Sequence, residues 1–501
     1  MIDMHALGQA LHLLFHSFAP WMVVIPGLVI GLVFAAVPGL QISTAMAVFL
    51  PATLYMDFLQ AMLFLTAIFT AGSFGGSVSA ILMNIPGTSS CVATTFDGYP
   101  MARKGLHNEA LGLALGSSCF GVAMGYIILF LLVQPLSTAV LKLGPSEMFV
   151  VVLWGLTLIA TLRGKYMARG ILAGTFGLLI ATIGMSTNSA IRGTFGSPFL
   201  LDGIPWVPGL IGLFAASELF NLVEKPYLVE SEDARRLSFA RILKGFASTF
   251  KYPKVLLRGG IIGTLIGAVP GVGSSVANLV SYAETRRRAP DADTFGTGNP
   301  KGVVAAESAN SSAEGGSIGT LLALGLPGGG GTAVMMAAFM MHNITGGPRF
   351  IREQTDIVYG IIIGNFIQVF LLVGVGLLFI HLLSSIVKVP LRFLVPSVLV
   401  LSTLGAFALE GSIVGPIAVW VFGALGWLLR RYDYPVAGAA VGLILGKMAE
   451  GELLRTYQIS GGDIGYLFGR PITMVFAVLL LLSLFWEPMK ARFLARRGGA
   501  S

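Results

Sequence analysis

The chain has 501 residues, of which 55% are hydrophobic and only 11% are charged. Soluble domains carry roughly 25% charged residues, so this composition excludes a soluble protein and indicates one that crosses a lipid bilayer several times. The net charge of +8 does not indicate nucleic-acid binding, because the basic residues lie in loops between apolar segments, as in positively charged cytoplasmic loops.

Residues 1–20 predict an amphipathic helix in the membrane interface. Apolar side chains recur there at helical spacing, at Leu7, Leu11, Leu14, Phe15 and Phe18. This segment has no basic n-region and no clear cleavage site, so we expect no cleavable signal peptide.

Residues 21–223 predict the first membrane unit. It opens with two apolar stretches that are broken at Pro-Gly, GLVIGLVFAAVPGLQISTA at 27–45 and FGGSVSAILMNIPGT at 74–88. A polar loop at 97–109 follows. Uninterrupted spans are then expected at 110–133, 147–162, 168–187 and 204–223. Residues 224–258 are rich in Lys and Arg and predict a cytoplasmic linker.

Residues 259–489 predict a second copy of this unit. The stretch GGIIGTLIGAVPGVGSSVA at 259–277 is identical to 27–45 at nine of nineteen positions. With one inserted residue, 314–329 (EGGSIGTLLALGLPGG) also resembles 74–88, and two motifs in the same order indicate a duplication. Spans are expected at 356–383, 392–409, 412–429, 434–449 and 470–487, before a basic cytoplasmic tail at 490–501.

Counting spans back from the two basic segments predicts the topology. Loop 97–109 is then cytoplasmic, whereas loop 342–355, at the equivalent place in the second unit, lies outside. The sequence therefore predicts an all-α polytopic membrane protein of about 10–12 spans, with two inverted-topology repeats that each carry Pro-Gly-broken helices or re-entrant segments. The inversion requires residues 392–429 to cross the membrane twice.

Pro-Gly at membrane depth frees backbone groups that lipid cannot satisfy. Paired interruptions of this kind are typical of the binding sites of secondary transporters. A packing kink is the alternative for any single proline, but four breaks in two repeats favour a substrate site.

Each break is followed by a helix restart, whose free N–H groups and positive dipole end bind anions. Glycine lets a ligand approach the backbone, and Ser or Thr adds a hydroxyl; simple helix capping is the alternative role of these hydroxyls. The predicted substrate-binding residues are Pro38, Gly39, Ser43, Thr44, Pro86, Gly87, Thr88, Ser89, Pro270, Gly271, Gly273, Ser274, Ser275, Pro327, Gly328, Gly329 and Thr332.

Three polar residues, Asn84, Glu307 and Asn310, are candidates for coupling transport to a cation. Freed carbonyls at the breaks can coordinate Na⁺, and Asn84 and Asn310 can add side-chain oxygens. Glu307, Asn310 and Glu314 share one helical face, and an acid at membrane depth is a functional candidate. An acid close to a loop, at the helix entry, is the alternative interpretation of Glu307.

Motifs for catalysis or ATP hydrolysis are missing from the sequence. It contains no GxxxxGK[ST], HExxH or GxSxG pattern, and the glycines at 328–331 follow an apolar helix rather than a strand. We therefore expect no enzymatic activity, no cofactor and no metal site, with Na⁺ or H⁺ as the coupling ion.

Several stretches resemble the tripartite tricarboxylate transporter family, in particular its large permease subunit (TctA-type). They are the motifs at 27–45 and 74–88, DGYPMARKG, IGAVPGVGSS, ESANSSAEGGS and LALGLPGGGGTAVMMAAFM, and the likeness runs from about residue 20 to about residue 490. Glu314 departs from the family pattern, in which a small residue is expected.

The resemblance implies a secondary carrier of the bacterial-type inner membrane, driven by a cation gradient. It also implies a small four-span membrane subunit and a periplasmic solute-binding protein that delivers an organic carboxylate. A stand-alone anion or metabolite carrier or exporter without a binding protein is the alternative. A third hypothesis, a membrane enzyme or assembly scaffold, is disfavoured by the missing catalytic motifs.

Overall fold

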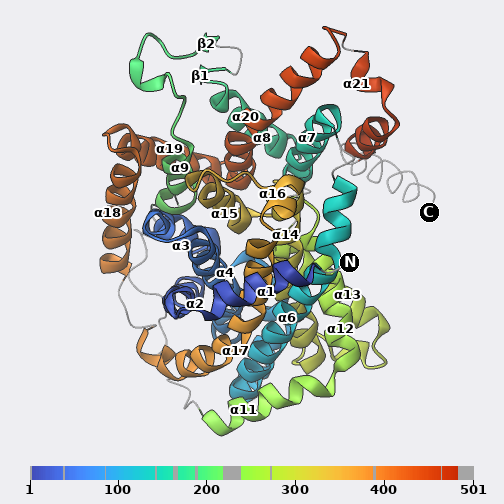
Figure 1. Ribbon diagram of the computed structural model, residues 1–501. Coiled ribbons are helices and arrows are strands. Elements are labelled where there is room, and N and C mark those ends of the chain that lie inside the picture. Colours follow the sequence, from blue (N-terminus) through green and yellow to red (C-terminus); the bar gives the residue numbers. More distant parts are fainter. Residues whose placement is uncertain are drawn as a thin grey trace, which may run out of the picture.

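The computed structural model (Figure 1) describes residues 3–37, 40–84, 86–140, 144–161, 167–186, 190–217, 220, 238–270, 273–386, 391–463 and 465–482. Helices make up nearly all the regular structure of this part of the chain, and a short hairpin of β1 (Gly184–Met185) and β2 (Ile191–Arg192) is its sheet. The predicted all-α membrane class is confirmed.

The first half of the chain folds into long helices joined by short 3-10 segments. Its elements are α1 (Met4–Phe15), α2 (Ala19–Ala36), α3 (Ile42–Phe49), η1 (Leu50–Tyr55), α4 (Phe58–Met83), η2 (Ser89–Cys91), α5 (Val92–Arg103), α6 (His107–Val140), α7 (Pro145–Thr161), α8 (Met167–Ala181), η3 (Pro198–Leu200), α9 (Trp206–Ile211) and the π-helix η4 (Gly212–Ala216).

The second half begins within the predicted linker. Its elements are α11 (Phe239–Ser248), η5 (Thr249–Lys251), α12 (Pro253–Gly267), α13 (Gly273–Arg288), η6 (Ala292–Thr294), α14 (Pro300–Leu324), α15 (Gly330–Met341), α16 (Pro348–Glu353), α17 (Thr355–Ile386), α18 (Leu391–Glu410), α19 (Val414–Arg431), α20 (Val436–Ile459) and α21 (Tyr466–Gly469).

Four helices of the described chain are long and apolar enough to cross a membrane. They are α2, the Phe58–Leu82 part of α4, His107–Leu136 of α6 and Thr355–Ile380 of α17. Shorter apolar helices cover several other predicted spans, such as Ala168–Ala181 and Pro471–Leu482. The predicted span 204–223 is a short helix continued by the π-helix η4, as far as it is described.

The four Pro-Gly motifs interrupt helices, as predicted. The first two separate α2 from α3 and α4 from η2 and α5, and the last two separate α12 from α13 and α14 from α15. The two halves therefore share a pattern in which a helix ends at Pro-Gly and a new one begins a few residues later. The boundaries and inverted relation of the repeats stay predictions.

Equivalent glycines bring equivalent helices together in the two halves. Gly31 on α2 and Gly263 on α12 occupy the same place in the repeated motif. A Cβ at Gly31 would clash with the Ile68 carbonyl oxygen of α4, and one at Gly263 would clash with the Ala309 carbonyl oxygen of α14. The absence of a side chain thus lets each pair of backbones touch, as small residues do between membrane helices.

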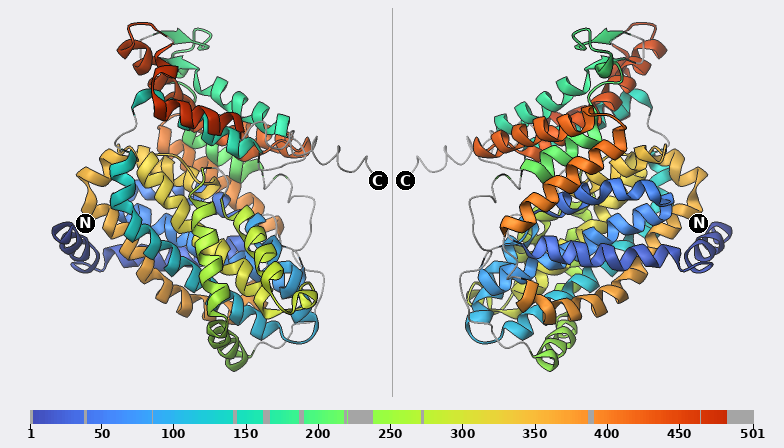
Figure 2. Two further views of the ribbon diagram at one scale, coloured as in Figure 1. Left: turned by 90° about the vertical axis from the view of Figure 1, so that its right-hand side faces the viewer. Right: turned by 90° about the vertical axis from the view of Figure 1, so that its left-hand side faces the viewer.

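α14 is the central helix of the fold. Each of its residues from Gly302 to Ala323 is buried, and α4, α6, α12 and α13 pack around it. Figure 2 shows that α7, α8 and α20 form a separate layer at one end of this bundle. The polar side chains of this central helix cannot reach water, so they need hydrogen-bond partners within the protein.

Of the two predicted surface segments, the N-terminal one is helical as expected, and the linker contains a helix that the sequence did not indicate. The predicted N-terminal helix is present as α1, and its position at the membrane interface stays a prediction. In the predicted linker, α11 packs against α6, where Arg241 forms an ion pair with Glu109 at 2.8 Å. Residues 224–237 of the linker and the tail at 490–501 lie outside the described residues.

Candidate functional site

Three of the four breaks meet through side-chain contacts. Ser89, after the second break, lies with its Oγ 2.8 Å from the Oγ of Ser275, after the third break. The Ser89 amide and hydroxyl also lie 3.5 Å from Oε1 of Gln41, which follows the first break. The contact between Ser89 and Ser275 joins the two halves of the chain across 186 positions.

The fourth break closes this group. A Cβ built on Gly329 would lie 3.7 Å from the Cα of Gly273, and one built on Gly330 would lie 3.3 Å from the Oγ of Ser43. Gly329 and Gly330 therefore lie against the third and the first break. The structure brings together the segments that the sequence predicts to form one site.

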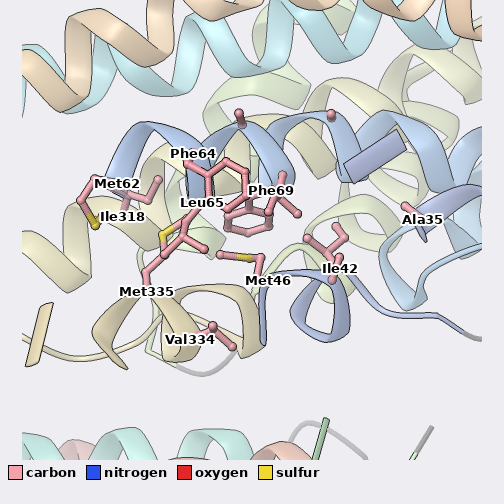
Figure 3. Packing of buried hydrophobic residues seen from close by; sticks show 14 of the residues in the cluster. Ala35, Ile42, Met46, Met62, Phe64, Leu65, Phe69, Ile318, Val334 and Met335 are labelled. Atoms are coloured by element: carbon pink, nitrogen blue, oxygen red, sulfur yellow. The ribbon is translucent and has the colours of Figure 1, made fainter. Parts of the chain in front are cut away.

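An apolar layer fixes the helices that restart at these breaks. Figure 3 shows Met46 of α3 next to Phe69 of α4, with Val334 and Met335 of α15 below them in the view. A Cβ on Gly331 would come within 3.3 Å of the Met46 sulfur. This apolar packing holds α3 and α15 against α4.

The accessible members of the predicted site form a small set. Ser89 is exposed, and Gly273, Ser274, Ser275 and Gly329 are partly exposed. Since α13 begins at Gly273, the first-turn amides of Ser274 and Ser275 lack an acceptor within their own helix. These groups offer N–H and hydroxyl donors at a positive helix end, which suits a carboxylate.

Other predicted members are engaged in holding the fold. Thr44 donates to the carbonyl of Phe214 at 3.2 Å, and Thr88 contacts Ser90 at 2.9 Å. Thr332 accepts from the Gly329 amide at 2.9 Å and so caps α15. Thr332 therefore has the capping role that the sequence left as the alternative to ligand binding, whereas Thr44 and Thr88 bond to other parts of the fold.

The remaining predicted members line or support the breaks. Gly87 is buried, and its amide donates to the carbonyl of Gly76 at 3.1 Å. Pro270, Pro327 and Gly328 are also buried, and Pro86 is half-buried. Pro38, Gly39 and Gly271 lie outside the described residues.

The predicted cation-coupling residues do not form one group. Asn84 ends α4 in a left-handed conformation with φ of 58°, is exposed, and makes no hydrogen bond to Glu307 or Asn310 in the described part of the chain. Glu307 and Asn310 lie together inside the bundle on α14. Glu307 lies within α14, which begins at Pro300, and its side chain is fully buried.

Glu307, Asn310 and Glu314 line a polar stripe between α14, α4, α5 and α6. Glu307 accepts from Thr94 at Oε1 and from Ser118 at Oε2, the latter at 3.0 Å. Asn310 donates to the carbonyl of Ser73 at 3.0 Å. All of these side chains are buried, so the stripe is part of the protein interior.

Glu314 lies at the far end of the stripe. Its Oε1 accepts from Thr70 at 2.6 Å and from Tyr126 at 2.7 Å, and Gln368 donates to Thr70 at 3.1 Å. Its Oε2 is buried without a hydrogen-bond partner among the described residues.

Neither acid of this stripe forms an ion pair with a Lys, Arg or His of the described chain. Removing an unpaired carboxylate from water costs several kcal/mol. A buried carboxyl in this setting can bind a proton or a metal cation. Either reaction could couple transport to an ion gradient.

Several residues of these two regions were not predicted as site residues. Thr70, Ser73 and Tyr126 reach α14 from α4 and α6, and Asn278 donates to the carbonyl of Ser90 beside the breaks. A sequence signal exists only for α4, where hydroxyl residues recur within an apolar stretch.

Comparison with known proteins identifies relatives over most of the chain. Residues 21–441 match the model of the tripartite tricarboxylate transporter TctA family. An uncharacterized 52.8 kDa protein in the TAR-I ttuC′ 3′ region of Agrobacterium vitis is 31% identical over 450 residues, or 89% of this chain and 88% of the relative. An uncharacterized protein in the TAR-II ttuC′ 3′ region of the same organism is 33% identical over 210 residues, or 42% of this chain and 87% of the relative. No solved structure matches.

Proposed function

The chain belongs to the tripartite tricarboxylate transporter TctA family, and from this premise we propose that it is the large permease subunit that takes up an organic di- or tricarboxylate. Members of this family are transporter components, so the chain is a permease component rather than an enzyme. We also propose that a periplasmic binding protein delivers the substrate and that a small four-span membrane subunit completes the transporter. The complex would lie in a bacterial-type inner membrane, with the C-terminus of this chain in the cytoplasm.

The convergence of the four breaks is the observation that carries this proposal. The contact between Ser89 and Ser275 at 2.8 Å and the approach of Gly329 to Gly273 bring helix starts from both halves to one place. A carboxylate at this place would accept hydrogen bonds from amides and hydroxyls. It would need no Lys or Arg, and none lies within the four motifs.

The buried acids support coupling to a cation. Glu307 and Glu314 face neighbouring helices from α14, whose C-terminal end leads directly to the fourth break at Pro327-Gly328. A proton or Na⁺ bound on this stripe is thus joined to the substrate site by a single rigid helix. We propose Glu307 and Asn310, together with Glu314, as the coupling residues.

The arrangement of loops supports inverted repeats. At the start of α4, Phe58 packs against His342 and Phe350, next to loop 342–355. At the opposite end of α4, Ile81 lies against Gly98 of α5, within segment 97–109, which the sequence predicts as a loop and which is helical up to Arg103. This segment and segment 342–355 therefore lie at opposite ends of one membrane-length helix, as inversion requires.

Reconstituted uptake tests the proposal. Proteoliposomes that contain this chain and its small subunit, supplied with the binding protein, should accumulate a labelled di- or tricarboxylate such as succinate, malate or citrate when a Na⁺ or H⁺ gradient is imposed. Uptake should stop when the gradients are collapsed and should not need ATP. Gradient-driven uptake without the binding protein would instead support a stand-alone carrier. Uptake that requires ATP would refute both.

A further inference from the structure

A basic cavity lies apart from the breaks, where α12 begins, α13 ends and α14 begins. Its volume is about 420 Å³. Five cationic side chains line it: Lys251, Lys254, Arg258, Arg288 and Lys301. The concentration of positive charge around one hollow indicates an anionic ligand.

Two of the five cations are already paired with acids. Lys301 donates to Asp291 at 2.7 Å, and this hydrogen bond lowers the pKa of the Asp291 carboxyl. Arg288 binds Glu284, whose pKa is lowered to about 2 by hydrogen bonds from Arg287 and Arg288. Asp291 and Glu284 form no ion pair with the other three cations of the cavity.

The remaining cations are unpaired. No acid of the described chain lies within ion-pair distance of Lys251, Lys254 or Arg258. All three lie at or near the start of α12, whose dipole adds positive potential at this end. The cavity thus has a surplus of positive charge that no part of the described structure balances.

An unsatisfied hydroxyl provides independent evidence for a missing ligand. Thr285 lines the cavity, is only 2% exposed, and its Oγ1 has no hydrogen-bond partner among the described residues. Buried polar atoms are rarely left unpaired in native proteins, so an oxygen-rich ligand would complete this site.

The surface next to the cavity indicates what carries the anion. Beyond the cationic start of α12, the same helix exposes Leu257, Ile261 and Leu265 by 46%, 47% and 62%. These residues are spaced by four positions and form one apolar stripe. A charged headgroup in the cavity would therefore have its acyl chains along this stripe, an arrangement that a free anion would not use.

We propose that this cavity binds the phosphate headgroup of an anionic phospholipid. The unpaired cations and the Thr285 hydroxyl hold the phosphate oxygens, and the apolar stripe of α12 holds the acyl chains. Because α13 runs from Ser275 in the breaks to Arg288 at the cavity, the lipid would fix one end of a helix whose other end belongs to the candidate substrate site. The proposal does not depend on the identity of the transported substrate.

Native mass spectrometry of the purified full chain tests this site, with phosphatidylglycerol and phosphatidylcholine as probes. Phosphatidylglycerol should be retained preferentially. The double variant Lys251→Gln/Lys254→Gln should weaken its retention about fivefold for each cation removed. Both lysines are exposed, so the variant should stay folded and monodisperse. The matched control Lys104→Gln/Lys244→Gln removes two exposed lysines outside the cavity and should leave retention unchanged.

Three results would overturn the proposal. Equal retention of the two lipids would show that the cavity does not select a negative headgroup. Equal losses in the two double variants would show that only general surface charge matters. Displacement of phosphatidylglycerol by millimolar inorganic phosphate would assign the cavity to the free ion rather than to a lipid.

Discussion

Replacing Gly329, next to the fourth break, by valine should abolish substrate binding without unfolding the protein. Gly329 precedes α15 with an extended backbone (φ of −174°), a conformation open to any residue. A Cβ there would lie 3.7 Å from the Cα of Gly273, which is ordinary contact. Gly329→Val therefore fits the fold, but its methyl groups would cover the amides at the starts of α13 and α15.

The size of the effect follows from the hydrogen bonds that are lost. If the substrate carboxylate loses two charge-assisted hydrogen bonds of about 1.5–3 kcal/mol each, its affinity falls by at least about a hundredfold. The assay is equilibrium binding of a labelled carboxylate to the purified complex, followed by proteoliposome uptake. Gly374→Val on α17 is the matched control, because a Cβ there meets nothing within 4 Å. Wild-type affinity in folded Gly329→Val protein would refute a site at the breaks.

Three further predictions concern coupling, packing and topology. Glu314→Gln keeps an oxygen for the hydrogen bonds from Thr70 and Tyr126 but cannot exchange a proton, so counterflow exchange of substrate should persist while gradient-driven accumulation is lost; unchanged accumulation would exclude Glu314 from coupling. Gly87→Val should lower the melting temperature by several degrees, since its Cβ would clash with the Ala35 carbonyl oxygen, and a wild-type melting curve would contradict this packing. Cysteines at positions 104 and 349 should react with impermeant maleimide from opposite sides of the membrane, and labelling of both from one side would disprove the inverted repeats.

The helix breaks were predictable from the local motif, and their convergence was expected from its repetition in the two halves. Proline removes a backbone donor, and at the four repeated motifs Pro-Gly separates two helices. Pro-Gly alone does not end a helix, because Pro26-Gly27 lies inside α2 and Pro208-Gly209 lies inside α9. The repetition of the motif then indicated that equivalent helices are built alike, and Gly31 and Gly263 make equivalent contacts in the structure.

The individual roles of the hydroxyls could not be predicted, because they depend on tertiary neighbours. Ser89 and Thr88 are adjacent in the sequence, yet Ser89 is exposed at the junction of the breaks and Thr88 is buried against Ser90. The same limit applies to Asn84. Its amide suits a cation, but its left-handed conformation at the end of α4 leaves it apart from Glu307 and Asn310.

The environment of the acids was equally inaccessible from the sequence. Their spacing on one face of α14 follows from helical periodicity, whereas their burial depends on how α4 and α6 pack around it. Tyr126 lies within an apolar run of α6, and nothing in its local pattern indicates that its hydroxyl reaches Glu314. Partners contributed by distant helices are therefore the part of a site that only the fold reveals.

Substrate protection of a cysteine at position 275 tests the central claim most directly. Ser275 lies at the junction of the breaks, and the native thiols of Cys91 and Cys119 are buried, so a Ser275→Cys variant should be labelled by maleimide selectively at the new thiol. If the carboxylate binds between the breaks, saturating substrate should slow this labelling about tenfold or more, whereas an unrelated anion should not. An unchanged labelling rate in a sample that binds the labelled substrate would contradict the claim and place the site elsewhere.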